Sequence, residues 1–443
     1  MKSVFYSSLD KVYKTIDRGE GVYVYDNEGN NYLDCAAGIA VSNIGYGVKE
    51  VIDAMHEQAK KITYVYGGTF TSEAKERLAN QIIDLAPDGM EKVFFCSGGS
   101  EAVESIIKIA RQYQIEKENP SKYKIISRWQ SYHGNTIATL SVGGRPSWRE
   151  KYEPYLLHMP HIPQCNCLHC PYGLSYPSCK LNCAEALERV IKYEGPESVA
   201  AFLIEPVTGT TACATVPPEG YMQRIREICD KYDILFCVDE VITGLGRTGK
   251  AFAMNHFGVV PDMIAIAKGL GGGYVPIGAV VVHKNVVNAF EKGTKNLMHS
   301  FTYAGNPIAC AGGSAVLKYI VDKDLISRSE KMGKIFLEKL KDGLGDLEIV
   351  SDVRGIGLLI GIEFAKDKET KVPFESDFNV CGKITKYCFD HNLIVASGIS
   401  GTVDGIKGDA LQLSPPFVIE EKDMDFAVAT LRDAILDVIN SIK

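Results

Sequence analysis

The sequence predicts an α/β fold, with a large domain built on a mostly parallel central sheet and a small α+β domain. Two observations support this class. At 443 residues the chain is too long for one ordinary core. Between about residues 50 and 310, short runs that are apolar throughout alternate with helical stretches, as in parallel sheets covered on both faces. The six runs are KVFFC (92–96), YKIISR (123–128), AAFLIEP (200–206), ILFCVDE (234–240), DMIAIAK (262–268) and IGAVVV (277–282).

The remaining elements follow from spacing and turn residues. Residues 20–34 predict a hairpin, because two Tyr/Val-rich runs flank a turn-prone stretch at 26–29. Apolar residues recur with helical spacing after Ser97 and again over 219–232. After about 312 we expect a helical stretch to about 345, a strand over 353–364, further short strands and a last helix.

These segments define the expected domain organisation. Residues 49–311 form the large domain, with a Cys-rich insert at 161–183. Residues 1–48 and 312–443 together form the small domain, so that both ends of the chain contribute to it.

Composition excludes several classes of protein. The chain is 46% hydrophobic and 23% charged, and its net charge of −7 includes no long run of either sign. No basic surface for nucleic acid or for an anionic membrane is therefore expected. The first residues have no apolar core of signal-peptide length, and no stretch reaches the roughly 18 apolar residues of a membrane span. We expect a soluble, cytoplasmic protein.

Two ionisable residues stand at the ends of apolar runs. Asp239 ends ILFCVDE and Lys268 ends DMIAIAK, which a flexible GLGGG follows. Ligands of open α/β sheets bind at the carboxyl ends of the strands. A partly desolvated lysine there is easier to deprotonate, as a Schiff-base nucleophile requires. The alternative is a strand-end lysine in solvent.

A glycine-rich turn adds a third part. CSGGSEA (96–102) joins a predicted strand to a helix through two glycines, so that free N–H groups at the helix start suit a phosphate. A simple turn capped by serine would show the same pattern. Residues 244–250 (GLGRTGK) also fit the front of a P-loop, but Ala251 stands where the magnesium-binding Ser or Thr should be.

Taken together, these segments resemble the class III aminotransferases, pyridoxal-phosphate enzymes of fold type I. The matching stretches are CSGGSEAVESIIKIAR (96–111), YHGNT (132–136), LIEPVTG (203–209), FCVDEVITGLGRTG (236–249), PDMIAIAKGLGGGYVPIGAV (261–280) and HSFTYAGNP (299–307). With weaker similarity elsewhere, the resemblance spans nearly the whole chain.

The resemblance implies a role for each matching residue. Lys268 would form the Schiff base with pyridoxal phosphate and move the substrate proton, and Asp239 would keep the pyridine nitrogen protonated. The residues expected to bind the cofactor are Gly99, Ser100, Tyr132, His133, Glu205, Asp239, Val241, Lys268 and Thr302. Thr302 would reach the phosphate of a neighbouring subunit, which implies a homodimer with shared active sites.

The sequence departs from the family at the expected substrate clamp. Relatives that use 2-oxoglutarate often carry an arginine where this chain has Asn135 or Gln412, and neither amide replaces that charge. The amino donor and acceptor therefore stay open, and Arg145 and Arg247 are alternative sources of a guanidinium.

The insert concentrates cysteines outside the family pattern. Its five thiols are Cys165, Cys167, Cys170, Cys179 and Cys183. Four thiolates with such spacing could bind zinc or an iron–sulfur cluster, whereas the alternative is a loop of free or redox-active thiols.

The expected function is an aminotransferase that moves an amino group from a primary amine (an ω-amino acid, diamine or amino acid) to a 2-oxo acid. A racemase or epimerase on the same fold would keep Lys268 and Asp239 but return the proton to the other face. A more distant alternative is a metal-binding redox protein centred on the cysteine cluster.

Overall fold

A seven-stranded sheet forms the centre of the computed structural model, which describes residues 3–397 and 401–442. Its strand order is β4 (Met90–Cys96), β10 (Gly278–His283), β9 (Met263–Ile266), β8 (Leu235–Asp239), β7 (Val199–Ile204), β5 (Lys124–Arg128) and β6 (His161–Ile162). From β9 to β6 all neighbours are parallel, whereas β10 runs antiparallel to both β9 and β4. The predicted mostly parallel sheet is therefore confirmed.

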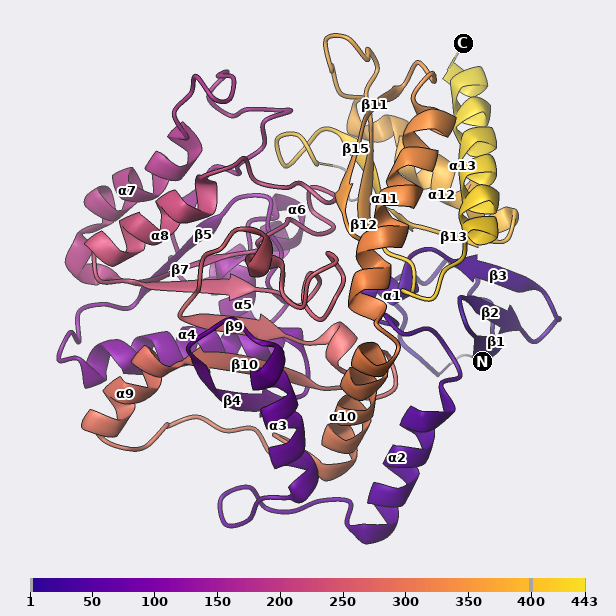
Figure 1. The fold of residues 1–443 in the computed structure, drawn as a ribbon. Helices are drawn as coiled ribbons and strands as arrows, with labels where there is room; N and C mark the ends of the chain where they lie inside the picture. Colours follow the sequence, from indigo (N-terminus) through magenta and orange to yellow (C-terminus); the bar gives the residue numbers. More distant parts are fainter. Residues whose placement is uncertain (1–2, 398–400, 443) are drawn as a thin grey trace.

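Helices cover both faces of this sheet, as Figure 1 shows. Alternate residues of β8 belong to two separate cores: Leu235 and Cys237 pack with α4 (Gly99–Glu116), and Phe236 and Val238 pack with α8 (Tyr221–Lys231). Every residue of β7, β8 and β9 is buried. This two-sided burial explains why the strands are apolar throughout instead of alternating with polar residues.

Two smaller sheets lie beside the large one. The first has the order β1 (Ile16–Glu20), β2 (Tyr23–Asp26), β3 (Asn31–Asp34) and β13 (Leu393–Ile394). The second has the order β11 (Val350–Ile356), β12 (Leu359–Phe364), β15 (Asp409–Leu413) and β14 (Ala396–Ser397). Strands β2 and β3 are the predicted hairpin, and β13 pairs in parallel with β3 and so joins the two ends of the chain.

The C-terminal helices are α11 (Leu325–Leu344), α12 (Val380–Asp390) and α13 (Glu421–Ile442). They pack on one another beside the second small sheet (Figure 1). The other α-helices are α1 (Ala37–Ala40), α2 (Lys49–Lys61), α3 (Glu73–Leu85), α5 (Ile137–Val142), α6 (Pro146–Arg149), α7 (Asn182–Glu194), α9 (Lys284–Lys292) and α10 (Pro307–Asp322). Within the described ranges, no helix combines the length and the apolar character that crossing a membrane would require.

One expected strand is wrong. Residues 353–364 were expected to form a single strand, but they span two antiparallel strands, β11 and β12, with Ile356 opposite Leu359. The chain reverses at Gly357, whose φ of +57° favours glycine, and a Cβ there would lie 2.4 Å from the carbonyl carbon of Thr248. Apolar residues on both sides of the turn hide it in the sequence.

Candidate active site

Asp239 and Lys268 lie close together at the carboxyl ends of two central strands of the large sheet. Asp239 is the last residue of β8 and pairs with Ala265 of the neighbouring parallel strand β9, which Lys268 follows closely. Both residues line a cavity of about 270 Å³ at the carboxyl ends of these strands. This is the position where open α/β sheets bind ligands.

The protein holds the Asp239 carboxylate in a fixed orientation. Its side chain is 6% exposed. Its Oδ1 accepts a hydrogen bond from the Val241 N–H at 3.0 Å, and its Oδ2 lies 2.9 Å from Nδ1 of His133. Nε2 of His133 is buried and has no hydrogen-bond partner among the described residues. The pair therefore presents an oriented carboxylate that can accept one more hydrogen bond from a ligand.

Lys268 stands in a strained backbone conformation with its side chain in the cavity. Its φ is +42°, which is uncommon for a residue other than glycine. Burial lowers the pKa of Lys268 to about 8, although the Asp239 and Glu205 carboxylates act in the opposite direction. With this pKa a minor fraction of Lys268 is the neutral amine at neutral pH and most of it is neutral above about pH 8, and nucleophilic attack on an aldehyde requires this neutral form.

The start of α4 forms the opposite wall. The helix is capped by Gly98, which has no side chain, so that the first N–H groups of α4 are open to the cavity. Two glycines allow close packing here. A Cβ on Gly99 would lie 2.9 Å from Cγ1 of Val241, and one on Gly134, whose φ is +132°, would lie 2.7 Å from Oγ of Ser100. Open N–H groups at the start of a long helix suit an anion such as phosphate.

Glu205 lines the cavity but is occupied by the backbone. Its Oε1 accepts from the Tyr132 N–H at 3.1 Å, and its Oε2 accepts from the Gly209 N–H at 2.8 Å. Burial raises the pKa of Glu205. Its carbonyl oxygen also accepts from Nη2 of buried Arg128 at 2.8 Å. Glu205 therefore holds the loop that carries Tyr132.

The remaining predicted cofactor residues divide between this cavity and the surface. Tyr132, His133 and Val241 line the cavity, whereas Thr302 is exposed and does not line it. Two further residues of the site were not predicted from the sequence: Val41, which reaches the cavity from the N-terminal segment, and Arg128, which lies behind Glu205. The signal for Arg128 in the sequence is its position at the end of the apolar run 123–128, where a charged residue is unusual.

The predicted zinc or iron–sulfur site finds no support. Four of the cysteines, Cys167, Cys170, Cys179 and Cys183, line a small cavity of about 20 Å³. The fifth, Cys165, is buried and accepts a hydrogen bond from Nη1 of Arg128 at 2.9 Å. Within the described part of the chain, which includes all five thiols, no group of three or more His, Cys, Asp or Glu residues could hold a metal. The five cysteines form no disulfide, and Cys165 is a hydrogen-bond acceptor for the buried Arg128.

Comparison with known proteins identifies the class. The family model of the class III aminotransferases matches residues 5–435, so the chain belongs to this family. It is therefore a transaminase of the pyridoxal-phosphate-dependent, fold type I class, as the resemblance implied.

Individual relatives show the range of the family. A putrescine–pyruvate aminotransferase of Pseudomonas aeruginosa is 35% identical over 96% of this chain and 91% of its own length. A leucine/methionine racemase of Thermococcus litoralis is 36% identical over 95% of this chain and 90% of its own length. The ω-transaminase of Pseudomonas jessenii in complex with PMP superposes with a TM-score of 0.90 at 31% identity, covering 97% of this chain and 93% of that one.

The residues present fit pyridoxal phosphate. The cavity combines an amine at Lys268, an oriented carboxylate at Asp239 and open N–H groups at the start of α4. These three groups are complementary to an aldehyde, a protonated ring nitrogen and a phosphate, respectively. Between them, Tyr132 and Val241 offer an aromatic and an apolar wall for a flat ring.

Proposed function

We propose that this aminotransferase uses Lys268 as its covalent and proton-transferring residue and Asp239 as the partner of the ring nitrogen. The observation that carries the proposal is the convergence of Lys268, Asp239 and the start of α4 in one cavity. Gly99 and Ser100 would bind the phosphate through their N–H groups. Tyr132 and Val241 would enclose the ring, and His133 and Glu205 would orient Asp239 and the Tyr132 loop.

Each residue has a defined task in this proposal. Bound pyridoxal phosphate supplies an electron sink that stabilises negative charge on the substrate carbon. The Asp239 carboxylate would accept a hydrogen bond from the ring N–H and so would favour the protonated form of the ring. Lys268, whose pKa lies near 8, would take the proton from the reacting carbon of the donor and pass it to the bound cofactor, and would carry a proton in the opposite direction when the second substrate accepts the amino group.

Substitution of Lys268 by alanine tests the assignment. We expect K268A to retain its fold and bind pyridoxal phosphate without a covalent bond, and to transfer no amino group. Borohydride treatment followed by peptide mass spectrometry should label Lys268 in the wild-type protein and no lysine in the variant. Labelling of a different lysine in the wild-type protein would overturn the proposal.

A racemase would use the same two residues, and one of the relatives catalyses racemisation. The two activities differ in how the cofactor changes when the amino donor is added without a 2-oxo acid. A transaminase converts its cofactor to the amine form when incubated with donor and no 2-oxo acid, whereas a racemase leaves the cofactor in its aldehyde oxidation state. We expect the amine form, measured by the loss of visible absorbance.

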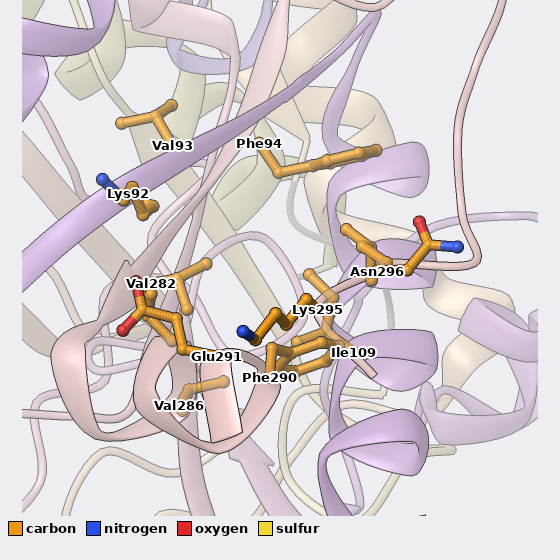
Figure 2. A pocket seen from close by; sticks show the side chains of 12 residues that line it. Lys92, Val93, Phe94, Ile109, Val282, Val286, Phe290, Glu291, Lys295 and Asn296 are labelled. Carbon is orange, nitrogen blue, oxygen red and sulfur yellow. The ribbon is translucent and has the colours of Figure 1, made fainter. Parts of the chain in front are cut away.

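We further propose that the active protein is a homodimer in which Thr302 completes the partner's phosphate site. A mostly apolar cavity of about 690 Å³ lies at β4, an edge strand of the central sheet, and residues of α9 and of the segment after it line it. Figure 2 shows side chains that line this cavity. That segment continues to Thr302, and Phe94 of β4 stacks on His299 at 5.0 Å.

Large exposed side chains surround this segment. Met298 is 74% exposed and Tyr303 is 64% exposed, and Tyr303 contacts Tyr64 edge-on at 6.0 Å. Such a cluster is typical of an interface. Sedimentation of the wild-type protein should give twice the 48.6 kDa of one chain. A monomer that binds the cofactor with full affinity would contradict the shared site.

We also propose that the protein is cytoplasmic. The cytoplasm is a reducing compartment, and none of the thirteen cysteines forms a disulfide.

A further inference from the structure

The structure distinguishes between the two arginines that the sequence leaves as possible substrate clamps. Arg247 is fully buried, and both of its terminal nitrogens donate hydrogen bonds within the fold, although its Nε has no partner among the described residues. Nη1 donates to the carbonyls of Leu358 at 2.9 Å and Pro415 at 2.6 Å, and Nη2 donates to Oδ1 of Asn43 at 2.6 Å. Arg247 therefore connects three segments of the fold by hydrogen bonds and is not available to a substrate.

The surroundings of Arg145 differ from those of Arg247. In the described ranges it makes no ion pair, and its Nε is buried without a hydrogen-bond acceptor. Its guanidinium carbon lies 4.6 Å from the ring centre of Trp148, and Trp148 meets Tyr132 edge-on at 5.2 Å. Tyr132 lines the cavity, whereas Arg145 does not. An aromatic pair thus holds an unpaired guanidinium just outside the cavity that contains Lys268.

The energetics favour an anionic ligand at Arg145. Burial lowers the pKa of Arg145 to about 10, with the Tyr132 hydroxyl acting in the opposite direction, so that the cation is maintained at neutral pH without a counter-ion. A half-buried charge without a counter-ion gains most from a carboxylate, which can accept two parallel hydrogen bonds from a guanidinium. Stacking on Trp148 restricts the plane of the guanidinium and prepares it for such a pair.

We infer that Arg145 binds a substrate carboxylate several bonds away from the reacting carbon, and so selects ω-amino acids or 2-oxo dicarboxylates over diamines. This inference rests on the proposed function. The distance follows from the placement: Arg145 contacts Trp148, which contacts Tyr132, and of these three residues only Tyr132 lines the cavity, so the carboxylate is not the one next to the carbon that faces Lys268. The positive charge repels the second ammonium group of a diamine.

The test compares R145Q with the wild-type holoenzyme on matched amines and acceptors. The donors are 5-aminopentanoate, 1-aminopentane and 1,5-diaminopentane with pyruvate, and the acceptors are 2-oxoglutarate and pyruvate with a fixed donor. We expect R145Q to lower kcat/KM for 5-aminopentanoate or for 2-oxoglutarate by about 10- to 100-fold, chiefly through KM. The loss for 1-aminopentane should be much smaller, and diaminopentane should improve relative to 5-aminopentanoate.

Two further variants separate charge from fold. R145K keeps the charge without the planar guanidinium and should restore part of the activity on 5-aminopentanoate. Exposed Lys151 lies nearby in sequence, and K151Q removes one positive charge outside the site and should leave all selectivities unchanged. Binding of glutarate, which cannot react, should weaken in R145Q by calorimetry.

The outcomes are distinct from those that test the proposed function. Equal losses on all amines and acceptors, or no loss on any carboxylate substrate, would overturn the role of Arg145. Wild-type protein that transfers no amino group from any of the amines, or whose Lys268 is not labelled by borohydride, would instead contradict the proposed function. A selective loss in the donor arm or in the acceptor arm identifies which substrate carries the carboxylate.

Discussion

Single residues determine the chemistry of the cavity, and Asp239 shows how. The sequence places a carboxylate at a strand end, but His133 and the Val241 N–H decide where its oxygens point. We expect D239N, which keeps the shape and removes the charge, to lower kcat by about 10²- to 10³-fold, the loss typical of one electrostatic partner.

The D239N measurement is a single-turnover rate with the donor in excess. Cofactor content must be equal in both proteins, since the comparison concerns the rate alone. A D239N variant of wild-type rate would show that the ring nitrogen does not depend on this carboxylate.

In the protein freed of cofactor, the protonation of Lys268 should make the rate of covalent attachment of pyridoxal phosphate depend on pH. Only the neutral amine attacks an aldehyde, and burial lowers the pKa of Lys268 to about 8 from an ordinary value of 10.5. The rate of covalent attachment of pyridoxal phosphate should therefore rise with pH up to about 8 and then level off. Stopped-flow absorbance across pH 6–10 would check this expectation, and a rate still rising at pH 10 would indicate an ordinary, solvated lysine.

Among the elements, the start of α4 depends on glycine. A Cβ on Gly99 would lie 2.9 Å from Cγ1 of Val241, so that one wall must move. Overpacking of this kind costs about 1–3 kcal/mol, and we expect G99A to weaken binding of pyridoxal phosphate by about 10- to 100-fold while the fold persists. Gly67 is the control, because a Cβ there meets no atom within 4 Å. Equilibrium dialysis measures both variants, and equal affinities for G99A and G67A would contradict a close-packed phosphate wall.

Elements were predicted well where burial is two-sided and poorly where a turn lies inside an apolar run. The runs that became β7, β8 and β9 are apolar because both faces are covered. In contrast, the hairpin of β11 and β12 was expected as one strand. Its turn at Gly357 lies inside an apolar run, and the close approach of Thr248, more than a hundred residues away, appears only in the folded chain.

Across the whole molecule, a buried ion network ties the Cys-rich insert to the second small sheet. Glu363 of β12 is 1% exposed and accepts from Nη1 of Arg354 at 2.7 Å and from Nε2 of His169 in the insert. Burial acts to raise the pKa of Glu363, but these two partners outweigh it and lower the pKa.

We expect E363Q to lower the free energy of unfolding by about 3–5 kcal/mol, because it removes the buried carboxylate that Arg354 and His169 share and leaves Arg354 with only the Asp352 carboxylate. The lowered pKa means that the ionised pair stabilises the fold above the ordinary pKa of a glutamate, and that this stabilisation is lost as the pH falls through the lower, folded-state value. Urea unfolding at neutral pH measures the change. D390N removes an exposed ion pair with Lys386 and should change stability by less than about 1 kcal/mol. Equal effects of E363Q and D390N would show that the network is not structural.

The division into a large domain at 49–311 and a small one from 1–48 and 312–443 stays a prediction. The pairing of β13 with β3 supports it, because this pairing joins the two ends of the chain in one sheet. Limited proteolysis that releases 49–311 as a stable core would support the proposed boundaries.

By itself, the sequence determined the alternation of strands and helices, the glycine turn before α4 and the placement of Asp239 and Lys268 at strand ends. These features depend on local spacing and on which residues follow a buried strand. Tertiary structure decided that Arg247 connects segments of the fold and Arg145 is unpaired, that Glu205 holds a loop, and that Cys165 accepts a hydrogen bond from Arg128 instead of binding a metal. The physical reason is that burial and hydrogen-bond partners come from residues distant in the chain, and only the folded arrangement shows which charges have already been satisfied.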